Sequence, residues 1–339
     1  MRFLIRLIAV LALVAGALSW DFARVLQTPL QLDEGATLSV PDGTGFVRLT
    51  HSLADHGWLA HAPRSLWYLR AYARWQGLDT RIKAGEYRLP VGTTPVQAVA
   101  LIVSGQAIVQ TLRLTEGWTF AQALAQVRAH PALKQTLPVD ADPTTVMRAI
   151  SDGFPPVQGE PEGWLFPDTY HFARGITDVA FLKRALTTMQ AVLAQEWEGR
   201  ADHLPYDSPE QALVMASIIE KETGIADERA QIAGVFVRRL NLGMRLQTDP
   251  TVIYGMGARY NGTIRKADLL ADTPYNTYTR DGLPPTPICL PSRAAIHAAL
   301  HPAPGKALYF VSRGDGSHVF SETLAQHNAA VRQYILNKK

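Results

Sequence analysis

The segment MASIIEKETGIADER, residues 215–229, places an apolar run directly before two carboxylates, Glu220 and Glu222. The spacing of its apolar residues predicts a helix that ends at the glycine that follows. On such a helix Glu222 shares a face with Ile218 and Ile219, whereas Glu220 lies about 200° round. The segment therefore predicts a core helix that carries one carboxyl group on its more apolar side.

A carboxyl group in that position is a candidate general acid. Removal from water penalises the charged form, so the pKa of Glu222 is expected to be raised, with a proton held near neutrality. The negative end of the helix macrodipole acts in the same direction. The alternative is that Glu220 and Glu222 are both solvated charges at an ordinary helix end. The helix pattern alone leaves both interpretations open.

Polar and aromatic segments follow this helix. Residues 244–257, MRLQTDPTVIYGMG, bring several polar side chains to a helix entry, and residues 273–292 are dense in tyrosine, threonine and proline. Ordered loops of this composition beside a candidate acid indicate a groove for an extended polyhydroxylated substrate. For Asp249, which precedes Pro250, a role as a helix N-cap is equally open.

Composition excludes several classes of protein. The chain has 339 residues, of which 47% are hydrophobic and 19% charged, and a net charge of +3 without a basic stripe, which disfavours nucleic-acid binding. The single cysteine, Cys289, excludes an internal disulfide and a cysteine-rich metal site. Nucleotide-binding and metalloprotease motifs are absent from the sequence. No cofactor or metal is expected, because the histidines lack metal spacing; they include His297, His301, His318 and His327.

The N-terminal residues 1–20, MRFLIRLIAVLALVAGALSW, form an apolar run flanked by Arg2, Arg6 and Trp20. A helix rising about 1.5 Å per residue is just long enough here to cross a ~30 Å hydrocarbon core. We expect an uncleaved transmembrane anchor, with the rest of the chain sent across the membrane by the positive-inside rule. The alternative is a cleaved signal peptide, since residues 15–17 read Ala-Gly-Ala.

Beyond the anchor, the pattern predicts an α+β protein. Residues 21–35 are expected to be a linker, and residues 36–95 a strand–helix–helix–strand domain rich in tryptophan and tyrosine. These aromatic side chains either fill a small core or stack on carbohydrate. Residues 96–339 are expected to form a larger, helix-rich domain.

Several segments together resemble the endolytic murein transglycosylases, the MltG/YceG-like family. The resemblance rests on EGWLFPDTY, ASIIEKET, IAGVFVRRLNLGMRLQTDPTVIYGMG, YNTYTRDGLPPTPI and LYFVSRGDGSHVFSETLAQHN, which cover most of residues 160–330. Residues 36–95 are similar, more weakly, to the LysM-like domain of that family. Membership implies a single-pass inner-membrane protein whose periplasmic catalytic domain cleaves peptidoglycan glycan strands, and so ends the elongation of nascent strands. It makes peptidoglycan the partner and peptidoglycan synthases candidate partners.

The resemblance also implies a mechanism with one glutamate, which acts first as acid and then as base and leaves a 1,6-anhydro sugar end. Glu222 precedes Thr223, close to the Glu-Ser pattern of related transglycosylases, so Glu222 is the expected catalytic residue and Glu220 the reserve. The residues expected to line the sugar subsites are Glu162, Gln247, Thr248, Asp249, Tyr254, Tyr275 and Asn276. Two other functions stay open: a glycoside hydrolase that uses Asp249 as second carboxylate, and a non-catalytic peptidoglycan-binding scaffold.

Overall fold

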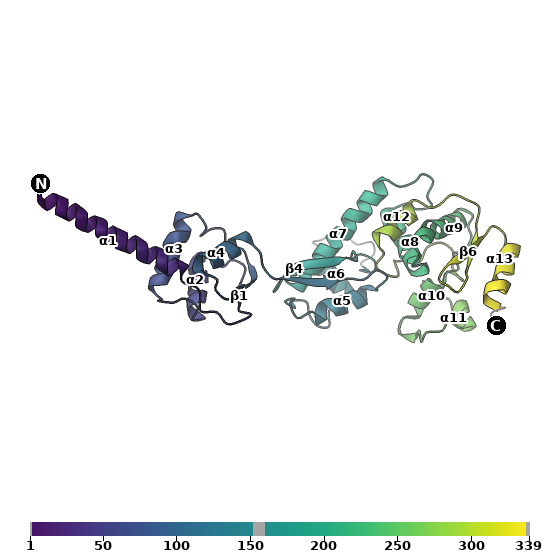
Figure 1. Cartoon of the computed structure of the whole chain (residues 1–339). Helices are drawn as coiled ribbons and strands as arrows, with labels where there is room; N and C mark the ends of the chain where they lie inside the picture. The colour runs from purple at the N-terminus through teal and green to yellow at the C-terminus, as the bar shows by residue number, and fades with distance from the viewer. Residues whose placement is uncertain (1, 152–159, 337–339) are drawn as a thin grey trace. The chain divides into compact units, whose positions relative to one another are not determined.

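The computed structural model describes residues 2–151 and 160–336 as a helix-rich α+β structure (Figure 1). Met1 of the expected anchor and residues 337–339 of the expected larger domain lie outside this range. The chain forms two compact units. Unit 1 contains the described residues up to Thr111 together with His171–Gly175, and unit 2 contains the described residues of Leu112–Tyr170 and those from Ile176 onward.

Unit 1 begins with helix α1 (Arg2–Gln27), which is long and apolar enough to cross a membrane. Its apolar N-terminal part is exposed, and only its last turns enter the fold, where Val25 and Leu26 are buried. Leu30 follows them into the same core. The stretch expected as a linker, residues 21–35, is therefore helical as far as Gln27 and packed against unit 1, because its apolar side chains complete that core.

The rest of unit 1 consists of β1 (Thr37–Val40), α2 (Phe46–Asp55), α3 (Arg64–Trp75), β2 (Gly85–Arg88) and α4 (Pro95–Ser104). Strands β1 and β2 pair antiparallel, with Thr37 opposite Arg88. Thr94 caps α4 through a capping box, and Val99 and Ile102 of α4 are buried in the same core as the strands. The unit thus extends beyond residue 95, where the sequence placed its boundary.

Unit 2 begins around β3 (Val109–Arg113), which pairs with β4 (Thr169–Ala173); the division between the units runs through these strands. Helices α5 (Phe120–Ala129), α6 (Pro143–Ile150) and α7 (Asp178–Glu198) belong to this part of the chain. Thr119, three residues before Gln122, caps α5 through a capping box. Helix α6 was not predicted, although Asp142 before Pro143 is a helix start signal and does cap it.

Helix α8 (Pro209–Glu222) is the centre of unit 2. Every residue from Ala212 to Ile219 is buried, and α8 contacts α7, α9 (Arg229–Asn241), α10 (Asp249–Met256) and α12 (Arg293–Leu300). A helix that is apolar on all sides is buried on all sides. The sides of α8 therefore differ too little in burial to distinguish Glu220 from Glu222, and the contacts of the two carboxyl groups distinguish them instead.

The C-terminal elements of unit 2 pack around the helices that contact α8. They are α11 (Lys266–Leu270), the antiparallel hairpin β5 (Tyr309–Ser312) and β6 (His318–Ser321), α13 (Leu324–Val331) and a short π-helix, η4 (Arg332–Leu336). Phe310 of β5 packs edge-on against Phe236 of α9, with ring centroids 5.6 Å apart. This contact fixes the hairpin on the helical core.

Candidate active site

Glu222, the last residue of α8, lines a cleft of about 450 Å³ within unit 2. Its lining comes from the loop Leu246–Asp249, from Arg239 and Tyr278, and from the β5–β6 hairpin and α13. The cleft thus gathers side chains from segments more than a hundred residues apart around one carboxyl group.

Thr248 connects the loop to this carboxyl group. Its hydroxyl donates a hydrogen bond to Glu222 Oε2 at 2.7 Å. The loop is held from behind, because the backbone N–H of Thr248 donates to Thr277 Oγ1 at 3.1 Å and the Thr251 hydroxyl donates to the Thr248 carbonyl at 2.7 Å. Gln247 has φ of 51°, an uncommon conformation for a residue other than glycine that is often found at functional sites.

Burial raises the pKa of Glu222 above its usual range, and the nearby Asp249 carboxylate acts in the same direction. The hydrogen bond from Thr248 and the proximity of His318 oppose this rise. The negative end of α8 also disfavours a charge at this position. Glu222 is therefore suited to hold a proton and, after releasing it, to be stabilised by the Thr248 hydroxyl.

Glu220 has different surroundings. It accepts hydrogen bonds from the backbone N–H of Ser292, at 2.9 Å, and from the Ser292 hydroxyl. Ser292 is the N-cap of α12, so this carboxylate anchors the start of α12 on α8. Glu220 is not among the residues that line the cleft. Its contacts are those of a structural side chain.

Asp249 lines the same cleft as Glu222 and is the first residue of α10; the N-cap is Thr248. The Tyr278 hydroxyl donates to Asp249 Oδ1 at 2.6 Å. A second carboxylate thus faces the cleft, already held by a tyrosine. It can stabilise positive charge that develops on a bound substrate.

Helix α9 and the β5–β6 hairpin add cationic and aromatic side chains to the lining of the cleft. Arg239 of α9 is 7% exposed; its guanidinium donates to the carbonyls of Leu308, Arg245 and Leu246 and lies 5.2 Å from the ring centroid of Tyr309. His318 of β6 is fixed by Glu228, which contacts its ring Nδ1 at 2.7 Å and accepts from its backbone N–H at 2.9 Å. If Nδ1 of a neutral His318 ring donates to the Glu228 carboxylate, then Nε2 carries no proton and can accept a hydrogen bond.

The model of the YceG-like family matches residues 38–333, a range that includes every residue of this cleft. The chain belongs to the YceG-like family.

Individual relatives agree with this assignment. The endolytic murein transglycosylase of Bacillus subtilis (strain 168) is 29% identical over 331 residues, which cover 94% of this chain and 90% of the relative. That of Streptococcus pneumoniae serotype 2 (strain D39 / NCTC 7466) is 25% identical over 371 residues, with 99% of this chain and 66% of the relative covered. A crystal structure at 2.6 Å of the yceG-like protein lmo1499 from Listeria monocytogenes matches with a TM-score of 0.55 and 27% identity, and the match covers 87% of this chain and 98% of that one.

Of the sugar-lining residues expected in this YceG-like chain, Gln247, Thr248 and Asp249 line the cleft. The other four lie outside that lining. Glu162 is buried and accepts from the backbone N–H of Phe120 at 2.8 Å and from the Tyr254 hydroxyl at 3.1 Å. Tyr275 contacts the Thr286 hydroxyl at 2.8 Å, and the buried Asn276 side chain donates to three carbonyls around the end of α11.

Several residues of the cleft were not predicted from the sequence. They are Arg239, Tyr278, Tyr309 and His318, among others. Their signal was present, since Arg239 lies in IAGVFVRRLNLG, Tyr278 in YNTYTR, and the last two in LYFVSRGDGSHVF, all segments that carry the family resemblance. Polar and aromatic residues within those segments were therefore further candidates for the lining of the cleft.

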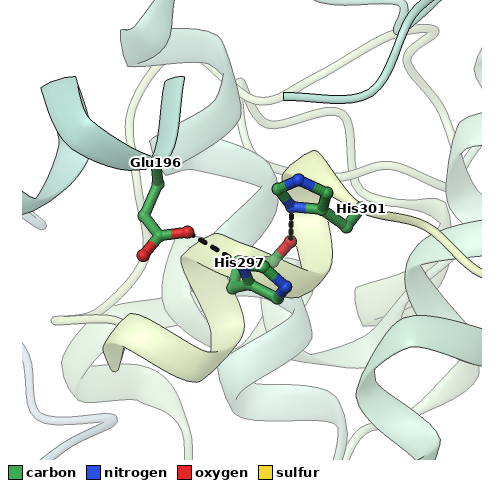
Figure 2. Close-up of side chains that lie close together, drawn as sticks. All are labelled: Glu196, His297 and His301. Carbon is green, nitrogen blue, oxygen red and sulfur yellow. Dashed lines mark hydrogen bonds and ion pairs between the residues drawn. The ribbon is translucent and has the colours of Figure 1, made fainter. Parts of the chain in front are cut away.

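A separate cluster lies at the junction of α7 and α12. Figure 2 shows Glu196 with His297 and His301, which offer ligand atoms within 4.8 Å of one another. The i, i+4 spacing of His297 in α12 and His301 at its C-cap was the sequence signal for this pair, although the histidines were expected to lack metal spacing. The Glu196 carboxylate, however, is already bound by Arg293 at 2.7 Å and His297 at 2.8 Å, and both ring nitrogens of His301 face backbone carbonyls. The contacts are those of an ion-pair cluster that joins the two helices.

Proposed function

We propose that this chain is an endolytic murein transglycosylase, a lyase that cuts inside peptidoglycan glycan strands, with Glu222 as its single acid and base. The observation that carries the proposal is a carboxyl group with a raised pKa, hydrogen-bonded to Thr248, at the wall of an open cleft. The names of the relatives from Bacillus subtilis and Streptococcus pneumoniae supply the reaction.

Protonated Glu222 gives its proton to the glycosidic oxygen between N-acetylmuramic acid and N-acetylglucosamine, and the C1–O bond breaks. The resulting carboxylate takes the proton of the muramoyl C6 hydroxyl, whose oxygen attacks C1 and closes the 1,6-anhydro ring. No water is consumed, and Glu222 regains its proton. Both steps use the same carboxyl group, so its pKa must favour the acid form without preventing ionisation.

Other side chains of the cleft support the charge that develops at C1. Asp249, held by the Tyr278 hydroxyl, supplies a fixed negative charge. Gln247 and Thr248 supply polar groups to the lining of the same cleft, where sugar hydroxyls need partners. We propose these three side chains as substrate-binding residues. Structural roles are assigned to Glu162, Tyr254, Tyr275 and Asn276, which do not line the cleft and form hydrogen bonds within the protein.

We assign unit 1 a complementary role. Helix α1 is proposed as an uncleaved membrane anchor, with the rest of unit 1 and all of unit 2 in the periplasm and the strand–helix–helix–strand part of unit 1 as a LysM-like domain. The whole is proposed to end the elongation of nascent strands near the membrane, where peptidoglycan synthases are the expected partners.

The reaction is tested by its products. Purified protein acting on long, uncrosslinked glycan should release internal fragments that end in 1,6-anhydro sugars and are lighter by one water than hydrolytic fragments, as measured by mass spectrometry. The Glu222→Gln variant serves as the inactive control. Fragments with reducing ends that take up borohydride label would instead identify a hydrolase that uses Asp249. Uncut glycan that still binds the protein would identify a scaffold.

A further inference from the structure

The exposed side of α3 in unit 1 carries two tryptophans. Trp67 and Trp75 are 72% and 78% exposed, whereas Leu69 and Ala73 on the opposite side are fully buried. Helical spacing places exposed Ala71 between the two indoles. We call this surface, Trp67, Ala71 and Trp75 with Arg64 and Arg74 at its edges, the tryptophan face. Large exposed aromatic side chains on one side of a helix mark an interaction surface.

The first turns of α3 contact α1 at a defined level. Asp21 pairs with Arg64 at 3.3 Å and accepts from the Tyr68 hydroxyl at 2.9 Å, and the rings of Phe22 and Tyr68 have centroids 5.1 Å apart. The core of unit 1 receives α1 further on, at Leu26. Along α1, therefore, α3 lies nearer the apolar N-terminal stretch than the core does.

That level has the composition of a membrane interface. Trp20 is 65% exposed, and the Arg24 guanidinium lies 5.4 Å from its ring centroid. Leu18, Ser19 and Phe22 line a shallow hollow together with Tyr68 of α3. Tryptophan, tyrosine and arginine are the residues that anchor proteins among lipid headgroups. The tryptophan face continues this set from α1 onto α3.

We propose that the tryptophan face of α3 docks in the headgroup region of the membrane that α1 spans. The face points away from the buried side of α3, and the first turns of α3 contact α1 at the level where α1 enters the lipid. Trp67 lies within these turns, and Trp75 follows two turns later on the same face. Arg64 pairs with Asp21 at 3.3 Å and Arg74 with Asp79 at 3.5 Å, so the docking is assigned to the two indoles and not to a net positive charge. Unit 1 then lies on the bilayer surface. This inference rests on the proposed membrane anchor.

The test uses the full-length chain with Cys289→Ala, in which single cysteines carry a spin label. Ala71→Cys reports the tryptophan face without removing either indole. Ala12→Cys reports the depth of α1. Val91→Cys is the control for a label in water, because Val91 is exposed and lies two residues before Thr93, whose carbonyl accepts a hydrogen bond from Leu30 beyond the end of α1. The protein is reconstituted in vesicles of phosphatidylethanolamine and phosphatidylglycerol, and label depth is measured by power saturation with oxygen and a nickel chelate. We expect hydrocarbon depth at residue 12, headgroup depth at residue 71 and water at residue 91.

The outcomes separate this proposal from the anchor. A label at residue 12 in hydrocarbon with residue 71 in water overturns the docking and leaves the anchor intact, whereas both labels in water remove the anchor as well. Trp67→Ser with Trp75→Ser should move the label at residue 71 from headgroup depth to water, with cleavage of dissolved glycan unchanged. If glycan strands, rather than vesicles, immobilise the label, the face binds carbohydrate and the proposal is wrong.

Discussion

Glu222 and Glu162 lie in two regions of unit 2 that both raise the pKa of a carboxyl group but differ in whether that group lines a cleft. Burial raises the pKa of both carboxyl groups, that of Glu162 to about 7. Glu162 is enclosed, with one oxygen bound by the backbone N–H of Phe120 at the start of α5 and the other by the Tyr254 hydroxyl. Glu222 has one oxygen bound by Thr248 and lines an open cleft. A raised pKa therefore identifies an acid only when the proton can reach a substrate.

The sharpest test of this difference exchanges each carboxyl group for an amide. Glu222→Gln keeps the size of the side chain but cannot supply a proton, so turnover of purified glycan should fall by a factor of at least ~10² while thermal unfolding changes little. Glu162→Gln should keep turnover close to that of the wild type. Glu220→Gln, on the same helix as Glu222, is the matched control and should also retain most of its turnover. Loss of turnover in Glu220→Gln with an active Glu222→Gln would reverse the assignment.

The enclosed carboxyl group of Glu162 should instead affect the pH dependence of the free energy of unfolding. The pKa of Glu162 rises from 4.5 to about 7 on folding, so the protonated form is favoured in the folded state. This contribution is fully present below pH 4.5 and is lost as the pH rises through about 7. At ~1.4 kcal/mol per pKa unit, it amounts to about 3 kcal/mol. The free energy of unfolding of Glu162→Gln, relative to wild type, should therefore increase by up to that amount between pH 4.5 and 8.

Chemical denaturation at a series of pH values measures this difference. Using the difference between variant and wild type cancels the contributions of other titrating groups. A difference that stays constant across the range would show that Glu162 ionises normally, and would remove the likeness to Glu222.

The sequence predicted the local features of both regions and missed those that depend on distant contacts. The N-cap signal at Thr119 and the helix that carries Glu222 depend only on neighbouring residues, although that helix ends at Glu222, two residues before the glycine at which it was predicted to end. The role of Glu220 depends on Ser292, 72 residues away, and that of Glu162 on Phe120, 42 residues away. The periodicity of apolar residues in a sequence does not reveal contacts between residues so far apart.

Family motifs also selected residues without regard to where they lie. Segments such as YNTYTR contain both cleft residues and structural residues, so Tyr278 was overlooked while its neighbours Tyr275 and Asn276 were chosen. In α8 the hydrophobic pattern does not indicate which glutamate faces a cleft, because the helix is buried on every side. Only the fold separates a polar side chain that faces the cleft from one that holds a loop.

The smallest expected effect concerns the one hydrogen bond that distinguishes Glu222 within its cleft. Thr248→Val keeps the shape of the side chain but removes the hydroxyl that donates to Glu222 Oε2. That bond favours the charged carboxylate and lowers its pKa, so its loss should raise the pKa of Glu222 further. The basic limb of the pH dependence of kcat/KM should then move to higher pH, because the acid form persists longer, while the maximum falls by less than ~10-fold through poorer positioning. Thr248→Ser retains the hydroxyl and should leave the limb in place. A limb that moves to lower pH, or that moves equally in both variants, would mean that the limb reports a group other than Glu222, and Asp249 would be the next residue to test.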